Sequence, residues 1–324
     1  MTHSSLFIIN SPFQALCTAE AIKEYNISNY LIVLLRNRND KRNDKTEKIL
    51  EDFSLKYTHV FITSFYGLLK KGVLKKFDKS LYNCKYNNVF IGDYYSSSFR
   101  LFSLFFTNKN SKTILLDDGS ATLLLYEYGL NHIKVKSSNV IIKNKFVNLL
   151  TYFRSRQTVS FFSIFKPNNS NLLFVQNSLS VLAVSKKTVN ANNSYIIGTS
   201  MSEQGMLTED AYFEHLYRII SKFPNETFYY CPHRVEGVEK LQKIQQQFNI
   251  EIFNTEYTIE YDFYKKDIMP HIIIGFGSTA LYTLKTIYPN IEAYSILFDS
   301  NDEINSLYEV LNNSYKQKGI LFIK

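Results

Sequence analysis

The sequence has little of what fibrous, disordered or disulfide-rich proteins are built from. Its 324 residues include 11 glycines, 6 prolines, 3 cysteines and no tryptophan. So little glycine and proline excludes collagen-like and low-complexity architectures. A hydrophobic content of 45% excludes a chain too polar to form a core. Cys17, Cys84 and Cys231 cannot all pair and show no CxxC spacing, so neither a disulfide scaffold nor a zinc site is indicated, and a reducing compartment suits the chain.

Long apolar runs are also absent. No segment reaches the roughly 18 consecutive apolar residues of a membrane-spanning helix, and residues 1–10 lack the pattern of a secretory signal. We therefore expect a cytoplasmic protein, at most peripheral on the cytoplasmic face of the inner membrane. Residues 68–77 interleave four lysines with apolar residues. This stretch forms either an interfacial helix or, as we prefer, a solvated helix packed on a sheet.

Positive charge is in excess, since 37 Lys and Arg residues against 29 Asp and Glu residues give a formal net charge of +8. This balance favours anionic partners such as nucleic acid, a phosphate-bearing substrate or an anionic membrane surface, and it does not choose among them. The charges are dispersed and no signature of a nucleic-acid-binding fold occurs. A non-catalytic nucleotide or nucleic-acid binder is therefore the minor alternative, and we expect no nucleic-acid partner.

Apolar runs alternate with helical stretches along most of the chain, which predicts βαβ units around parallel sheets. We expect two Rossmann-like halves, residues 1–185 and 186–324. Residues 131–193 are less regular and are expected to hold peripheral helices and the interdomain linker. The segment 292–298 is expected to close the second sheet. The expected strands are 6–10, 30–35, 60–63, 88–92, 113–116, 195–198, 228–231, 251–253, 271–275 and 292–298.

The junction after the fifth expected strand carries two adjacent carboxylates. Open parallel sheets bind ligands beyond the carboxyl ends of their strands, and Asp117 and Asp118 lie at such a position before Gly119. Adjacent carboxylates repel each other, which raises one pKa toward the range of a general base. The alternative interpretation is an acidic turn that caps a helix starting near Ser120.

Three junctions of the second half are suited to a ligand, and the first two of them to an anion. The first, at Pro232-His233-Arg234, places an imidazole beside a guanidinium group. The second, at Gly277-Ser278-Thr279, places glycine and hydroxyls at a helix start, and the third, at Gly198-Thr199, is a loop of small residues. None is a GxGxxG fingerprint or a P-loop. Glu209 and Asp210 follow the small-residue loop in the first turn of an expected helix, where acids usually serve the helix dipole.

Taken in order, these motifs resemble those of the bacterial sialyltransferases. The set looks most like glycosyltransferase family 52, the lipooligosaccharide sialyltransferases, and the bacterial polysialyltransferases and family 80 sialyltransferases share the motifs. The opening Ser11-Pro12-Phe13-Gln14 and the segment 197–212 also resemble family 52. The resemblance covers residues 6 to 290, about nine-tenths of the chain.

The resemblance implies a GT-B fold, an α/β architecture of two Rossmann-like domains facing a central cleft. Residues 1–185 would form the acceptor-side domain and residues 186–324 the CMP-sugar domain. It implies inverting transfer of sialic acid from CMP-sialic acid to a bacterial surface glycan, lipooligosaccharide or capsule, with no metal and no cofactor. The partners would be a CMP-sugar donor and a glycan or glycolipid acceptor, and an oligomer is compatible. The alternative donor is another CMP-nonulosonate or a Kdo-type sugar.

The resemblance also assigns roles residue by residue. Asp117 is the first choice for the base that takes the acceptor proton, and Asp210, or Glu209 beside it, is the second. His233 would bind or protonate the leaving phosphate, flanked by Pro232 and Arg234. The family motif Pro-His-Pro-Arg-Glu here is Pro-His-Arg-Val-Glu, so the second proline is missing.

The remaining expected contacts are to the donor nucleotide. Ser278 and Thr279, with Gly277 before them, would hold the CMP phosphate. The ribose hydroxyls would be held by Glu260, with Glu256 as the alternative. Gly198 and Thr199 would line the donor loop.

Overall fold

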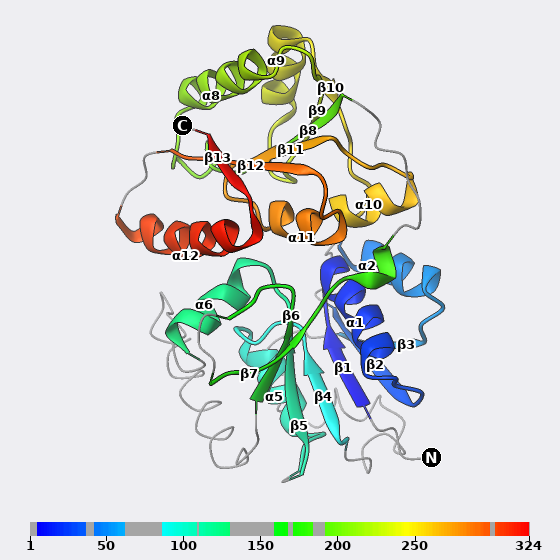
Figure 1. Ribbon diagram of the computed structural model, residues 1–324. Coiled ribbons are helices and arrows are strands. Elements are labelled where there is room, and N and C mark those ends of the chain that lie inside the picture. Colours follow the sequence, from blue (N-terminus) through cyan, green and yellow to red (C-terminus); the bar gives the residue numbers. More distant parts are fainter. Residues whose placement is uncertain are drawn as a thin grey trace. The chain divides into compact units, whose positions relative to one another are not determined.

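The computed structural model describes residues 5–36, 42–61, 86–108, 110–129, 159–167, 171–183, 192–298 and 302–323 (Figure 1). The basic stretch 68–77, for which a helix is expected, and Cys84 lie outside the described residues. Within the described ranges, no helix combines the length and the apolar character needed to span a bilayer. Cys17 and Cys231 are both buried, and neither forms a disulfide within the described residues.

The chain divides into two compact units. Unit 1 comprises residues Met1–Val181 and unit 2 comprises residues Leu182–Lys324. The boundary expected from the sequence, after residue 185, falls in the segment 184–191, which lies outside the described residues. Each unit is built on its own parallel sheet with helices on its faces (Figure 1).

Unit 1 contains a seven-stranded parallel sheet with the order β3-β2-β1-β4-β5-β6-β7. Its strands are β1 (Ser5–Ile9), β2 (Tyr30–Arg36), β3 (Tyr57–Phe61), β4 (Asn88–Ile91), β5 (Lys112–Leu116), β6 (Val159–Ser163) and β7 (Leu173–Gln176). Its described helices are α1 (Pro12–Glu24), α2 (Arg42–Asp52), α5 (Ser97–Leu104) and α6 (Ser120–Tyr128), and a 3₁₀ turn, η2 (Ser180–Leu182), spans the boundary between the units.

The central strand β1 is buried along its whole length, as expected for a parallel strand covered on both faces. Leu6 and Ile8 belong to the core that includes the apolar residues of α5. Phe7 points to the opposite face, where its ring stacks on Phe90 with centroids 4.3 Å apart. The alternation of strand side chains therefore builds two cores from one apolar run.

Unit 2 contains a six-stranded parallel sheet with the order β10-β9-β8-β11-β12-β13. Helices α8 and α9 cover one face and α10 and α11 cover the other (Figure 1). Its strands are β8 (Asn193–Ile197), β9 (Thr227–Cys231), β10 (Glu251–Ile252), β11 (Ile272–Gly275), β12 (Glu292–Ile296) and β13 (Leu321–Ile323). Its helices are α8 (Glu209–Lys222), α9 (Val238–Phe248), α10 (Ile259–Lys265), α11 (Thr279–Ile287) and α12 (Asp302–Lys318).

Two expectations about the sheet edges are wrong. Residues 131–193 were expected to hold peripheral helices and the linker, but they contribute strands β6 and β7, and β7 forms the edge of the unit 1 sheet. Residues 131–158 lie outside the described residues. The strand at 292–298 does not close the second sheet, because β13 pairs with β12 and forms the edge. The three strands that were not predicted, β6, β7 and β13, are short and lie among polar residues. Their apolar runs are too brief to be distinguished from a loop by sequence pattern.

The strand order reverses direction at one point in each sheet. In unit 1 this point lies between β1 and β4, and in unit 2 between β8 and β11. The segments that follow these two adjacent strands run to opposite faces of the sheet. Such a switch point has a crevice at the carboxyl ends of the two strands. The loops that follow these strands are therefore the positions at which a doubly wound sheet binds its ligand.

Candidate functional site

Three of the predicted motifs lie on one edge of the unit 2 sheet. In the strand register, Ile197 pairs with both Cys231 and Gly275, so β8, β9 and β11 end at the same level. Because strands lie about 4.8 Å apart, the loops of His233 and Ser278 start about 10 Å from each other, with the Gly198 loop between them. The structure thus brings together the residues Gly198-Thr199, Pro232-His233-Arg234 and Gly277-Ser278-Thr279.

His233 is half-buried in the loop after β9. Its Nδ1 atom is buried and makes no hydrogen bond to any described residue. Burial, followed by the positive charge of Arg234, lowers the pKa of the imidazole. A neutral ring offers one N–H donor, and an approaching phosphate would raise the pKa again because it favours the charged form. Arg234 is exposed and Pro232 is half-buried.

Ser278 and Thr279 begin helix α11 and are both half-buried. The Ser278 Oγ accepts a hydrogen bond from the Ala280 N–H at 3.3 Å, and the Tyr315 hydroxyl donates to the Ser278 carbonyl at 2.7 Å. Gly277 has a φ of +63° and faces the Tyr308 ring, so a side chain there would meet both strain and a clash. A helix start held in this way presents N–H donors to an anion.

The two acids expected near the ribose differ in exposure. Glu260 lies in the first turn of α10 and is only 5% exposed. It accepts a hydrogen bond from the Thr283 hydroxyl at 2.5 Å, and burial raises the pKa of its carboxyl. Glu256 is exposed in the loop before α10. Glu260, the first choice, is therefore buried and hydrogen-bonded inside unit 2, whereas Glu256, the alternative, is exposed.

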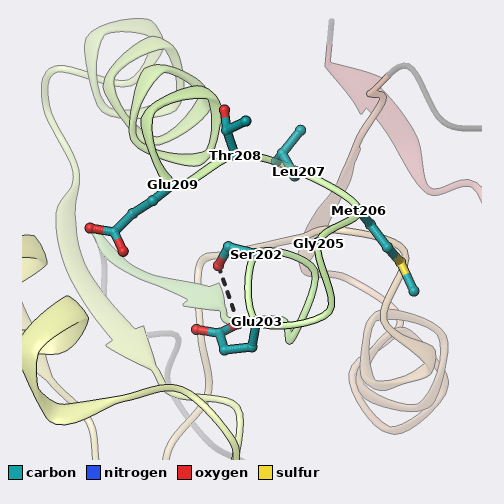
Figure 2. A pocket seen from close by; sticks show the side chains of 7 residues that line it. All are labelled: Ser202, Glu203, Gly205, Met206, Leu207, Thr208 and Glu209. Carbon is teal, nitrogen blue, oxygen red and sulfur yellow. Dashed lines mark hydrogen bonds between the residues drawn. The ribbon is translucent and has the colours of Figure 1, made fainter.

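A pocket of about 420 Å³ opens beside the loop after β8. Figure 2 shows the carboxylates of Glu203 and Glu209 on one side and Met206 and Leu207 on the other. Glu209 forms an ion pair with the exposed Lys243, with 2.6 Å between Oε1 and Nζ. The pocket is lined by Ser202, Glu203, Gly205, Met206, Leu207, Thr208 and Glu209.

Asp210, the second choice for the base, is exposed in the first turn of α8 and is not among the residues that line this pocket. Thr208 caps this helix, because its hydroxyl accepts from the Ala211 N–H at 3.2 Å. Acids in a first turn stabilise a helix through its dipole. The position of Asp210 therefore has a structural explanation that needs no ligand.

Asp117 is enclosed at the carboxyl end of β5. It has no exposed surface. Its Oδ1 accepts from the Ser163 hydroxyl at 2.5 Å, and its Oδ2 accepts from the Ile164 N–H at 2.8 Å and from the Asn177 amide at 3.2 Å. Burial, only partly offset by these donors, raises its pKa to about 7. Although Asp117 lies at a position where parallel sheets bind ligands, its carboxylate does not project into a crevice but turns toward the ends of β6 and β7.

Asp118 is half-buried at the same edge and is held by a residue from another loop. The Gln14 amide donates to its Oδ1 at 2.9 Å. The backbone N–H of Asp118 donates to the Thr122 hydroxyl at 2.9 Å, which closes the turn into α6. Gln14 was noted only as part of the opening Ser-Pro-Phe-Gln segment, and no feature of the sequence indicated its partner.

The charged residues behind the histidine loop were not predicted to have a role. Glu236 accepts a hydrogen bond from the His233 N–H at 2.7 Å and forms an ion pair with Lys240 at 2.7 Å. The only signal in the sequence was the acid three residues after the histidine. Among the described residues, no three or more His, Cys, Asp and Glu side chains cluster in a way that could hold a metal.

With this geometry established, comparison with known proteins decides the family. The model for the alpha-2,8-polysialyltransferases (POLYST) matches residues 5–297. The chain belongs to this family. At the family level it is a sialyltransferase, and therefore a glycosyltransferase, as the motifs implied. The polysialyltransferases are one of the groups whose motifs the sequence shares. No curated protein sequence matches the chain.

Solved structures of similar fold match nearly the whole length of this polysialyltransferase-family protein. An alpha/beta-galactoside alpha-2,3-sialyltransferase from Photobacterium phosphoreum is 14% identical, with 99% of this chain and 98% of that one covered and a TM-score of 0.57. A putative UDP-N-acetylglucosamine 2-epimerase from Listeria monocytogenes is 11% identical, with 98% and 88% covered and a TM-score of 0.56. At such identities the likeness shows the fold alone, which is GT-B as predicted.

Proposed function

We propose that the protein transfers sialic acid from CMP-sialic acid to a hydroxyl of a bacterial surface glycan, with inversion and without a metal. One observation carries the proposal. The carboxyl edge of the unit 2 sheet gathers His233, the Gly198-Thr199 loop and the Ser278-Thr279 helix start at the switch point. These are donors suited to a phosphate, and membership of the polysialyltransferase family supports sialyl transfer as the reaction.

The leaving group accounts for the residues of unit 2. When the bond from the anomeric carbon to the phosphate oxygen breaks, the electron pair stays on CMP and its phosphate gains negative charge. His233 donates a proton or a hydrogen bond to that oxygen, and the hydroxyls of Ser278 and Thr279 and the N–H groups of α11 stabilise it. Losing one preorganised donor of this kind typically costs about 3 kcal/mol in the transition state. Glu256, being exposed, is the better placed of the two acids to bind the ribose.

The acceptor hydroxyl needs a base, and unit 1 supplies a carboxylate. Asp118 is our choice within the Asp117-Asp118 pair, because Asp117 has no exposed surface and accepts three hydrogen bonds within unit 1. A base must reach the proton it removes. In this proposal unit 1 is the acceptor domain and unit 2 the donor domain. The acceptor is a lipooligosaccharide or capsule glycan on the cytoplasmic side of the membrane.

The test is transfer by the purified full chain. We expect release of CMP and formation of a sialylated product when CMP-sialic acid is supplied with a lactoside or with a short sialoside. Mass spectrometry identifies the product, NMR gives its anomeric configuration, and activity is expected to persist in EDTA. Parallel reactions with CMP-Kdo and another CMP-nonulosonate identify the sugar.

His233→Ala is expected to lower transfer by about 100-fold or more and to leave a measurable residual rate. His271→Gln is the matched control, since His271 lies before β11, at the opposite end of the sheet, and pairs with Glu226. Absence of both transfer and hydrolysis with every CMP-activated sugar would rule out the proposed function.

A further inference from the structure

The geometry assigns Glu236 as a positioning residue for His233. Its buried carboxylate holds the backbone of the histidine against the loop that follows β8. The inference rests on the proposed function, because it concerns the group that meets the leaving phosphate. Glu236 is the last residue of the histidine motif, but the resemblance assigned it no role.

The Glu236 side chain has no exposed surface. Its Oε2 accepts from the His233 N–H at 2.7 Å. Its Oε1 accepts from the Tyr230 hydroxyl at 2.6 Å and lies 2.7 Å from Lys240 Nζ. A buried charge is tolerated only when it is paired and hydrogen-bonded. All three donors serve this one carboxylate, so its position is closely determined.

The contact with His233 is reciprocal. The Glu236 N–H donates to the His233 carbonyl at 3.0 Å, while the Glu236 carboxylate accepts from the His233 N–H. Both backbone polar groups of the histidine are therefore held by the same residue. In the related motif a proline follows the histidine, and proline restricts the residue before it. Here Arg234 takes that place, and the turn closed by Glu236 restricts the histidine backbone instead.

Gly198 explains how the carboxylate reaches this place. A Cβ at position 198 would lie 2.3 Å from the Glu236 Oε2 and 2.8 Å from the Tyr230 hydroxyl. Glu236 therefore occupies the space that any other residue at 198 would fill. The backbone N–H of Gly198 also donates to the Cys231 carbonyl at 2.8 Å. This hydrogen bond joins the starts of the loops after β8 and β9, and the Glu236 carboxylate packs beside it against Gly198.

Lys240 is the counter-charge of Glu236 and connects it to the pocket of Figure 2. The ammonium is 5% exposed, lies 3.9 Å from the centroid of the Tyr212 ring and donates to the Ser202 hydroxyl at 2.7 Å. It also pairs with Glu203 at 3.1 Å. Burial lowers the pKa of the His233 imidazole most, Arg234 and Lys240 lower it further, and Glu203 raises it.

A double-mutant cycle separates positioning from simple stabilisation. We expect Glu236→Gln to lower kcat at least tenfold with less than a threefold change in KM for CMP-sialic acid, because the donor-binding hydroxyls remain. In the His233→Ala background the same substitution is expected to have no further effect on residual transfer. An equal loss in both backgrounds would overturn the inference. Lys243→Gln is the control and is expected to keep full activity. Lys243 lies on α9, as Lys240 does, and its exposed ion pair is with Glu209.

A second variant covers the case in which Glu236→Gln does not fold. Glu236→Asp keeps a negative charge beside Lys240 and shortens the side chain by one methylene, so the carboxylate no longer spans all three donors. The same tenfold loss of kcat is expected, again only when His233 is present. Full activity of Glu236→Asp would contradict the inference.

A readout without turnover distinguishes this inference from the proposed function. NMR titration of the histidine rings is expected to show a lower midpoint for His233 in Glu236→Gln, since Lys240 keeps only Glu203 of its two counter-charges, and no change in Lys243→Gln. If the wild-type protein transfers no sugar, the proposed function fails, whereas this titration still tests the contact. An unchanged His233 titration and unchanged ring shifts in Glu236→Gln would refute the assignment.

Discussion

Gln14 and Asp118 lie 104 positions apart in the chain and are joined by a hydrogen bond of 2.9 Å from the Gln14 amide to the Asp118 carboxylate. The amide is itself oriented, because its Oε1 accepts from the Asn10 N–H at 2.9 Å. Gly92 makes room for it, since a Cβ at this position would lie 2.3 Å from the Gln14 Oε1. The loops after β1, β4 and β5 therefore meet at one side chain, on the switch-point edge of unit 1.

The first prediction separates the two adjacent acids. Asp118→Asn is expected to lower kcat about 100-fold or more, the usual effect of losing a general base. Asp117→Asn is expected to stay within about fivefold of wild type, because an amide can keep hydrogen bonds to Ser163, Ile164 and Asn177. Steady-state transfer with matched circular dichroism spectra checks both. An inactive, folded Asp117→Asn beside an active Asp118→Asn would reverse the assignment.

The exposed acid Asp210 provides the comparison for that experiment. Asp210→Asn is expected to retain at least half of the wild-type kcat, since its place in the first turn of α8 is explained by the helix dipole. If Asp210→Asn is inactive while Asp118→Asn transfers normally, the base belongs to unit 2.

The second prediction concerns the amide that orients Asp118. Gln14→Glu would place a second carboxylate beside Asp118, and like charges raise each other's pKa. A base with a raised pKa becomes protonated at higher pH, so the acidic limb of kcat is expected to move upward, with a greater loss at pH 6 than at pH 8. Gln14→Leu removes the hydrogen bond without adding charge and is expected to lower kcat without moving the limb upward. Identical pH profiles for both variants would contradict this role.

The third prediction concerns the pH dependence of His233. Burial and Arg234 lower the pKa of the free imidazole below its usual value of about 6.5. A protonated ring is needed to act as an acid, so kcat/KM is expected to fall as pH rises through this lowered pKa. Bound donor phosphate favours the charged ring, so the corresponding fall in kcat is expected at higher pH. Measuring both profiles, with Arg234→Gln expected to move the kcat/KM limb upward, tests the assignment.

The fourth prediction concerns stability. The folded-state pKa of Asp117 is about 7, whereas an unfolded aspartate titrates near 3.9. The folded state therefore holds a proton that the unfolded state releases, and the free energy of unfolding falls as pH rises from about 4 to about 7. Asp117→Asn cannot ionise and is expected to flatten this dependence. Urea unfolding at pH 5 and pH 8 measures it, and parallel curves for the two proteins would show that Asp117 is not the group responsible.

The fifth prediction concerns the loop before α11. Gly277→Ala would place a Cβ 2.2 Å from the Tyr308 ring at a φ of +63°. Non-glycine residues pay roughly 1 kcal/mol or more in this backbone region, and the clash adds to it. We expect a lower melting temperature and at least tenfold weaker CMP binding by calorimetry. Gly277→Ala combined with Tyr308→Ala is expected to recover part of the stability, and a variant with unchanged CMP affinity would argue against this loop as the phosphate site.

Most of the strands and their junctions were predictable from the sequence, because short apolar runs end in residues that are typical of turns and helix starts. Ser11 and Pro12 begin α1 as their residue types indicate, and Thr208 caps α8. The orientation of Asp117 was not predictable. In a strand buried on both faces the pattern does not say to which side a terminal residue turns, and its partners Ser163 and Asn177 lie 46 and 60 positions away.

The network around Glu236 was hidden for a related reason. Its carboxylate, Lys240 and Tyr230 are ordinary surface or strand residues by type, and only the folded arrangement buries them together. Charged residues on an amphipathic helix usually face solvent, so the sequence of α9 predicts an exposed Lys240. Lys240 is buried instead, because it pairs with Glu236, whose carboxylate fills the space beside Gly198.

Helix α12 and strand β13 follow residue 297, where the family match ends. Yet the hydroxyl of Tyr315 fastens the Ser278 carbonyl, and the ring of Tyr308 lies against Gly277. A protein shortened to the matched region would keep every motif side chain and lose the two tyrosines that shape the phosphate loop. Substitutions on this last helix therefore belong in any search for variants with altered nucleotide affinity, even though no recognised motif extends so far.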